Sequence, residues 1–218
     1  MGLPAVILIV GAYLIGSIPS AYLAGKWVKG IDLRQYGSGT VSGSMVWEHV
    51  ARWALFPVGI FDIFKAALPT WVGLELGLGD MTAVAAGIAA LVGHNWPLYL
   101  GFTGGRGLSP FLGTVIVIYP WGFAWLLAFL AIGFFLGDSA PWALAGLVLL
   151  PVFNHVMSGP AVLNLAAAAM VIITLIKRLE ANRRPLPEDQ TERRKVLLRR
   201  FFYDRDIRSH QEWLDRRL

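Results

Sequence analysis

The chain has 218 residues, of which 56% are apolar and only 15% are charged, and it contains no Cys. Soluble domains have about 25% charged residues, so the composition argues against a soluble domain. The lack of Cys excludes disulfides, thiol nucleophiles and thiolate metal sites. The net charge of +5 comes from residues 177–218, which hold 13 Lys or Arg against eight Asp or Glu, whereas residues 1–176 hold six of each kind. Beside an apolar domain, such a basic tail suits anionic lipid headgroups better than nucleic acid.

Five apolar segments are long enough to cross a membrane, since about 20 helical residues span the hydrocarbon. They cover residues 3–25, 53–74, 83–100, 110–136 and 140–178. The first lacks a basic leading region and is interpreted as a retained transmembrane helix, with a broken end in "GSIPSAYLAG". Residues 40–51 can add a short helix, and the last segment can form two short helices that meet near Gly159. We therefore predict an all-α, polytopic integral membrane helix bundle of about seven helices over residues 1–180, followed by a basic tail over residues 181–218.

The distribution of charges orients this bundle through the positive-inside rule. Basic residues follow the first, third and last segments, at Lys26, Lys29, Arg34, Arg106, Lys177, Arg178, Arg183 and Arg184. The loops assigned to the other side hold Glu75, Asp80 and Asp138 and no Lys or Arg. We therefore expect the N-terminus outside the cell and the basic segments and tail in the cytoplasm. This orientation requires that residues 140–178 make one net crossing.

Two glycine-rich stretches, "YGSGTVSGS" at 36–44 and "GGRG" at 104–107, interrupt the apolar sequence on the face predicted to be cytoplasmic. Glycine adopts positive φ and lets another group approach the backbone, and successive amides in such turns can bind an anion. The planar guanidinium of Arg106 suits a phosphate or a carboxylate. A flexible linker or a plain turn between two helices is the other interpretation of each stretch.

Polar residues also occur within the predicted helices, where an ionisable group is costly and suggests function. Asp62 and Lys65 are three residues apart, so they share one face of a helix. They form either a structural ion pair or a pair in which Asp62 orients Lys65 toward a polar pocket. His94 stands at a predicted helix end, where it caps the helix or contacts a ligand. Ser17 and Ser20, on either side of Pro19, are expected to bond carbonyls freed by the proline rather than to contact a substrate.

Three motifs in order, "GSIPSAYLAGKWVKGIDLRQYGSG", "DIFKAALP" and "GHNWPLYLGFTGGRG", resemble the acyl-phosphate:glycerol-3-phosphate acyltransferase family of bacterial inner membranes, the PlsY type. The similarity runs from about residue 11 to residue 180. The family's first loop reads like GSGN-x-GATN-x-x-R, and here Thr40, Met45 and Glu48 stand at its Asn, Asn and Arg positions. The last family motif, HRxNIxRL, keeps only Ile176, Arg178 and Leu179 in this chain.

The resemblance implies a seven-helix enzyme that moves a fatty acyl group from acyl phosphate to glycerol 3-phosphate, giving lysophosphatidic acid and phosphate. It implies a site that opens to the cytoplasm. We expect no cofactor and no nucleic-acid partner, and the spacing of the four His argues against a metal site. The catalytic candidates are Ser38 and Arg106. The substrate-binding candidates are Gly37, Gly39, Thr40, Ser44, Lys65, His94, Gly104, Gly105 and Gly107.

Two other functions stay open at this point. A non-catalytic relative that binds phospholipid or acyl phosphate as a sensor or assembly factor agrees with the replaced family residues. A small transporter agrees with the broken helices, but it does not explain why the glycine-rich stretches fall on one face.

Overall fold

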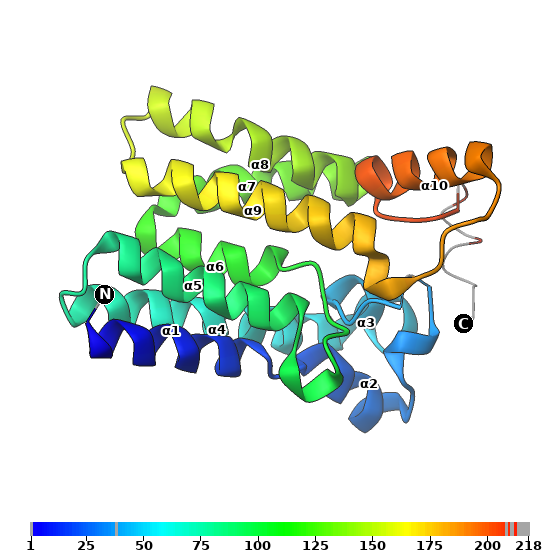
Figure 1. Ribbon diagram of the computed structural model, residues 1–218, viewed down its shortest axis with the longest axis horizontal. Helices are drawn as coiled ribbons and strands as arrows, with labels where there is room; N and C mark the ends of the chain where they lie inside the picture. Colours follow the sequence, from blue (N-terminus) through cyan, green and yellow to red (C-terminus); the bar gives the residue numbers. More distant parts are fainter. Residues whose placement is uncertain (1, 38, 208, 210–211, 213–218) are drawn as a thin grey trace.

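The computed structural model describes residues 2–37, 39–207, 209 and 212. All regular elements of these residues are helices, arranged as an elongated bundle (Figure 1). The longer helices are α1 (Leu3–Gly16), α2 (Ser20–Lys29), α3 (Gly43–His49), α4 (Leu55–Glu75), α5 (Asp80–Asn95), α6 (Leu108–Ile118), α7 (Pro120–Phe135), α8 (Ser139–Val156), α9 (Ala161–Glu180) and α10 (Gln190–Tyr203). Short 3-10 turns lie at η1 (Leu33–Gln35), η2 (Arg52–Ala54), η3 (Leu98–Leu100) and η4 (Ala181–Arg183).

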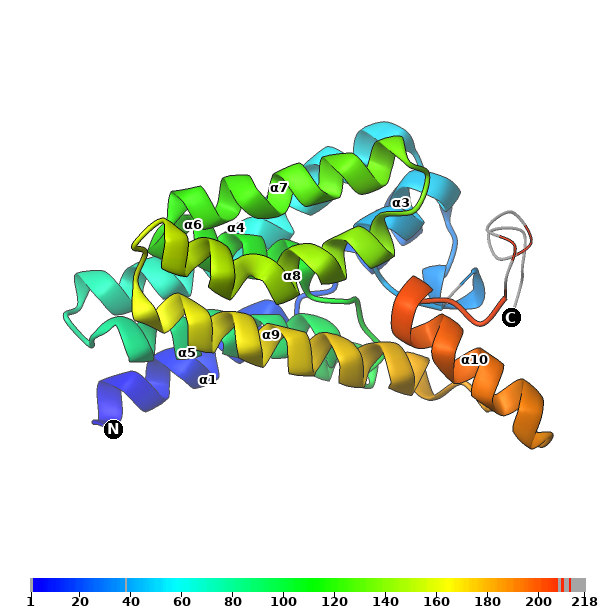
Figure 2. The same cartoon turned by 90° about the horizontal axis from the view of Figure 1, so that it is seen from above.

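The bundle runs back and forth between two ends. One end, called here the loop end, carries α2, α3, residues 36–37 and 39–44, residues 101–107 and α10 (Figure 1). The other, called the far end, carries the turns that join α4 to α5, α6 to α7, and α8 to α9 (Figure 2). Seven helices, α1 and α4 to α9, therefore connect the two ends among the described residues, which confirms the predicted all-α bundle of about seven helices.

The first predicted segment divides into α1 and α2 at Ile18 and Pro19. Pro19 has φ −89° and ψ 71° and precedes the first residue of α2. A proline ring removes one backbone donor and clashes with the preceding turn, so the helix stops and restarts in a new direction. The predicted break in "GSIPSAYLAG" is confirmed.

The fourth predicted segment, residues 110–136, contains two helices and not one. Tyr119 is extended, with φ −157° and ψ 94°, and Pro120 occupies the first turn of α7. This position suits proline because its missing N–H would have no helical partner. The Tyr119 hydroxyl donates to the Met157 carbonyl at 3.4 Å, so the α6–α7 turn lies beside the α8–α9 turn at the far end.

The turn between α6 and α7 corrects the predicted position of Asp138. Its carboxylate accepts from the Ala140 amide at the start of α8 and pairs with Arg205 of the tail at 3.0 Å. Asp138 therefore lies at the loop end with the basic residues, and its assignment to the opposite side was wrong. The two helices predicted around Gly159 are confirmed as α8 and α9, but together they make two crossings and not one net crossing. Each error omits one crossing, so the two errors cancel, and the N-terminus of α1 and the C-terminus of α9 still lie at opposite ends of the bundle.

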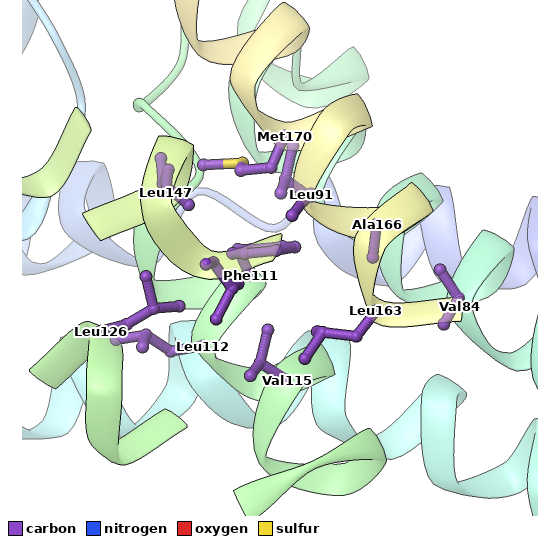
Figure 3. Packing of buried hydrophobic residues seen from close by; sticks show 12 residues of the cluster. Val84, Leu91, Phe111, Leu112, Val115, Leu126, Leu147, Leu163, Ala166 and Met170 are labelled. Atoms are coloured by element: carbon purple, nitrogen blue, oxygen red, sulfur yellow. The ribbon is translucent and has the colours of Figure 1, made fainter. Parts of the chain in front are cut away.

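The core packs between α5, α6, α7, α8 and α9, with Leu91, Phe111, Leu126, Leu147 and Met170 at its centre (Figure 3). Large apolar side chains also cover the outside of the bundle, among them Phe64, Trp71, Val152 and Ile172. Five described helical stretches are long and apolar enough to cross a membrane, and α6 and α7 are shorter apolar helices. The chain is therefore a multi-pass membrane protein, because apolar surface on every side of a bundle requires lipid around it.

Candidate active site

A buried polar cluster joins three helices near the loop end of the bundle. The Lys65 ammonium lies 2.9 Å from the Asp62 carboxylate and 2.8 Å from His94 Nδ1. It also donates to the Ile18 carbonyl at 3.2 Å, and the Ser20 hydroxyl donates to Asp62 at 2.6 Å. The predicted pairing of Asp62 with Lys65 is confirmed, and both residues are only 1% exposed.

The broken first helix makes this cluster possible. At the interruption the Ile18 carbonyl accepts from the Ser20 backbone amide at 3.1 Å as well as from Lys65, and the Ser20 side chain turns toward Asp62. Ser20 therefore bonds a carboxylate, and not the freed carbonyl that the sequence analysis expected. Ser17 does donate to a carbonyl, that of Tyr13 at 2.9 Å, but this carbonyl also accepts the Ser17 amide and is not freed by Pro19. An ammonium has three protons, and the three partners of Lys65 match them. In this arrangement Lys65 uses its three protons to hold Asp62, His94 and the Ile18 carbonyl in place.

The cluster fixes the orientation of the His94 ring. Because an ammonium only donates, His94 Nδ1 accepts from Lys65 and the ring proton is assigned to Nε2. Nε2 faces Gly105, where a Cβ atom would lie only 2.0 Å from it. The Gly105 amide in turn donates to the His94 carbonyl at 3.1 Å. Residue 105 must be glycine for the "GGRG" loop to close on the imidazole.

The two glycine-rich loops meet at the loop end. The Val41 amide donates to the Gly104 carbonyl at 3.2 Å. The Asn182 side-chain amide donates to the Gly39 carbonyl at 3.0 Å and to the Gly104 carbonyl at 3.3 Å. The expectation that the loops share one face of the bundle is therefore confirmed.

The loop conformations depend on positive φ angles. The φ angles are 50° at Gly37, 67° at Gly39 and 77° at Gly107. The Gly39 amide donates to the Tyr36 carbonyl at 2.7 Å, so this amide and that of Gly105 are engaged inside the protein. They fix the shape of the loops, and an anion cradle would have to use other donors.

Hydroxyl groups lie in a short row along the second half of the first loop. Thr40 is 3% exposed and its hydroxyl lies 3.3 Å from that of Ser42, which lies 3.0 Å from the hydroxyl of Ser44. These groups offer donors beside the loop. Ser38, predicted to be catalytic, lies outside the described residues.

Arg106 points toward the basic tail. Its Nε donates to the Asp204 carboxylate at 2.7 Å and its Nη1 donates to the Lys177 carbonyl at 2.9 Å. The Arg106 side chain is 15% exposed and that of Asp204 is 20% exposed. The guanidinium predicted to bind a substrate phosphate is thus paired with a carboxylate of the chain itself.

The segment that leads into the first loop is held by its own ion pair. Asp32 accepts from the Arg34 backbone amide at 3.0 Å and pairs with the Arg34 guanidinium at 2.6 Å. Hydrogen bonding to this guanidinium lowers the pKa of Asp32 below its ordinary value. The carboxylate therefore keeps its charge and caps η1 just before "YGSG".

A small pocket opens between the helix break and the two loops. Its walls include Gly16, Ile18, Ser20, Val41, His94 and Gly104. It thus joins the buried cluster to the meeting point of the loops. Two polar residues that contact the loops or Arg106 at this end, Asn182 and Asp204, were not among the predicted site residues. No local pattern marks them, since each reaches the site through contacts with residues far away in the sequence.

Comparison with known proteins gives a consistent result. The family model described as glycerol-3-phosphate acyltransferase matches residues 6–185. The chain belongs to this family. One relative, glycerol-3-phosphate acyltransferase 4 of Dehalococcoides mccartyi (strain CBDB1), is 34% identical over 96% of this chain and 93% of its own length. Another, from Parasynechococcus marenigrum (strain WH8102), is 37% identical over 78% of this chain and 82% of its own length.

Solved structures agree with the fold. The glycerol 3-phosphate form of PlsY (YgiH), an integral membrane glycerol 3-phosphate acyltransferase, superposes with a TM-score of 0.73 and 26% identity. That match covers 81% of this chain and 89% of the PlsY chain. The lysophosphatidic acid form of the same enzyme superposes with a TM-score of 0.70 and 24% identity. The predicted resemblance to the PlsY type is confirmed, whereas α10 and the residues after it lie beyond the match to the family model.

Proposed function

We propose that this chain is a membrane acyltransferase that moves a fatty acyl group from acyl phosphate to a hydroxyl of glycerol 3-phosphate. The hydroxyl oxygen attacks the acyl carbonyl carbon and the bond to the phosphate oxygen breaks. The hydroxyl proton passes to a phosphate oxygen, and the products are lysophosphatidic acid and inorganic phosphate. The observation that carries the proposal is the meeting of the two glycine-rich loops beside a buried His94 in a member of this family.

The chemistry asks the protein mainly to bring two anionic substrates together. Phosphate is a good leaving group, so positioning and charge stabilisation can supply much of the rate. Arg106 would bind one phosphate after it leaves Asp204, and Ser38, Thr40 and Ser44 would offer hydroxyl donors. Gly37, Gly39, Gly104, Gly105 and Gly107 shape the backbone around that anion. His94 would hold the second loop in place through its contact with Gly105, and Lys65 would fix the orientation of the His94 ring.

The acyl chain of the donor would lie against the apolar outer surface of the helices. Burial of each CH₂ group contributes about 0.8 kcal/mol, so a long chain gives the donor most of its affinity. The polar head would then reach the loop end, where the pocket joins both loops.

The loop end is proposed to face the cytoplasm, because the described basic residues gather there. Introduced cysteines test this orientation, since the natural chain has no Cys. A membrane-impermeant maleimide added to intact cells should label Glu75→Cys at the far end and leave Glu192→Cys on α10 unlabelled. The reverse pattern would contradict the orientation.

Turnover is the direct test of the proposed reaction. Purified protein in phospholipid bicelles, supplied with glycerol 3-phosphate and an acyl phosphate, should release phosphate and form lysophosphatidic acid in equal amounts. Arg106→Ala should reduce kcat/KM by about 100-fold, since a charge-assisted contact to a phosphate is lost. Phosphate release without the lipid product would contradict acyl transfer to this acceptor.

The second candidate is a protein that binds the same ligands without turnover. The pairing of Arg106 with Asp204 favours this candidate, because a carboxylate of the chain itself binds the guanidinium in place of a ligand. Glu48 at the family's Arg position favours it too. Acyl phosphate binding by calorimetry, together with no product after prolonged incubation, would support this candidate over the enzyme.

A further inference from the structure

We infer that Asn182 is a positioning residue that fixes the distance between the two glycine-rich loops. This inference rests on the proposed function, because it assigns Asn182 to the same reaction. Asn182 lies in η4, directly after α9. Its single side-chain nitrogen donates to the Gly39 carbonyl at 3.0 Å and to the Gly104 carbonyl at 3.3 Å.

The bonds go to backbone carbonyls from two different helix connections. Gly39 belongs to the connection between α2 and α3, and Gly104 belongs to the connection between α5 and α6. The described residues join these connections directly through the bond from the Val41 amide to the Gly104 carbonyl. Val41 and Leu100 also belong to one buried apolar cluster, which holds the two connections together without fixing their polar groups. The two N–H groups of the Asn182 amide add a second link and set their spacing.

The local backbone presents this amide in an unusual way. Ala181, Asn182 and Arg183 all have positive φ, at 45°, 53° and 63°. Such angles are uncommon outside glycine, and asparagine is among the residues that adopt them most readily. The run reverses the chain at the end of α9 and directs the amide back toward the loops. Its shape is closed by the Arg184 amide, which donates to the Ala181 carbonyl at 3.3 Å.

The same segment also holds the first loop at a second point. The Arg184 guanidinium donates to the Gly37 carbonyl, so residues 182 and 184 contact "YGSG" on both sides of residue 38. Arg200 of α10 anchors the segment by donating to the Arg184 carbonyl at 3.4 Å, and it donates to the Leu179 carbonyl of α9 at 3.0 Å. Asn182 therefore links the loops to α9 and, through α9, to the tail.

The loop spacing matters because the reaction needs two phosphorylated substrates in contact. A misplacement of about 1 Å can reduce the rate of a positioned reaction by about 100-fold. Loss of the link should therefore reduce kcat more than it raises KM, since each loop can still bind its own ligand.

Two substitutions separate the amide from the backbone conformation. Asn182→Gly keeps the positive φ and removes both donors, and Asn182→Asp keeps the size and conformation but places a carboxylate against two carbonyls. We expect kcat to fall at least tenfold for Asn182→Gly and further for Asn182→Asp, with KM changed by less than threefold. Asn164→Ala is the matched control, because it removes the amide that pairs with Asn154 near the far end at 2.8 Å, and it should keep kcat within twofold.

Hydrogen–deuterium exchange gives a readout that does not depend on turnover. Asn182→Gly should speed exchange at residues 36–44 and 101–107 together, whereas Asn164→Ala should not. If the natural chain shows no turnover, the proposed reaction fails while the exchange result still decides whether Asn182 links the loops. Unchanged kcat in a folded Asn182→Gly protein, or exchange that rises in neither loop, would overturn the inference.

Discussion

Replacement of Asp204 by Asn should increase the affinity of the site for a substrate phosphate. In the structure the Asp204 carboxylate pairs with the Arg106 guanidinium at 2.7 Å. A substrate phosphate must therefore displace the carboxylate before the phosphate can bind the guanidinium. Asp204→Asn removes the negative charge and keeps the side-chain size. The backbone should be unaffected, because residue 204 has φ 56° and asparagine tolerates this region at least as well as aspartate.

The size of the effect follows from the burial of the pair. A hydrogen bond to a charged group contributes about 1.5–3 kcal/mol when it is well shielded from water. Here the side chains are 15% and 20% exposed, and Asp204 Oδ1 is buried without a hydrogen-bond partner among the described residues. Solvent screening and this imperfect geometry reduce the figure to about 1 kcal/mol. That difference corresponds to about a fivefold lower KM for glycerol 3-phosphate.

Steady-state phosphate release in bicelles measures this change, with acyl phosphate at saturation. KM should fall about fivefold while kcat changes by less than twofold. Glu192→Gln is the matched control, because it removes one negative charge from the same tail at an exposed ion pair with Lys195, and its KM should not change. A KM that rises in Asp204→Asn would refute the reasoning, since it would mean that Asp204 holds Arg106 in its binding orientation.

The other predictions concern the buried cluster and the second loop. Lys65→Met should lower the free energy of unfolding by about 3–5 kcal/mol, because it leaves the Asp62 carboxylate buried without its cation, and thermal unfolding in detergent should show a lower Tm. Ser20→Ala removes only one bond to the same carboxylate, so it should cost about 1–2 kcal/mol; an equal or larger loss than for Lys65→Met would contradict this order. Gly105→Ala should reduce kcat/KM at least tenfold, because its Cβ would lie 2.0 Å from the imidazole. Gly59→Ala, a helical position with open space around it, should retain full activity, and similar activity in both glycine variants would argue against a tight loop.

Local patterns in the sequence predicted much of the fold. The apolar segments, the break at Pro19 and the turn near Gly159 were all visible, because membrane helices need long apolar runs and prolines interrupt them. Pro120 was visible within the fourth segment, but residues 110–136 were still counted as one crossing, because they are apolar on both sides of the proline and long enough for one tilted helix. This error placed Asp138 on the wrong side, and the turn between α6 and α7 and the pairing of Asp138 with Arg205 both correct it.

The candidate site was predicted in part. The ion pair of Asp62 with Lys65 followed from helical spacing, and the common face of the two loops followed from the alternation of crossings. The partners of these groups could not be predicted from spacing, because Ser20, which bonds Asp62, lies 42 positions away from it in the sequence. The division of the chain at residue 180 stays a prediction.

By itself, the sequence determined that this protein lies in a membrane, that its glycine-rich loops need special backbone angles, and which family it resembles. Composition, periodicity and motif order are local properties, so they can be read without the fold. Only the tertiary structure decided that Asn182 bonds both loops and that Asp204 occupies Arg106, which lies 98 positions away. Such contacts depend on how α9 and α10 pack at the end of the bundle, and nothing in the neighbouring residues specifies them.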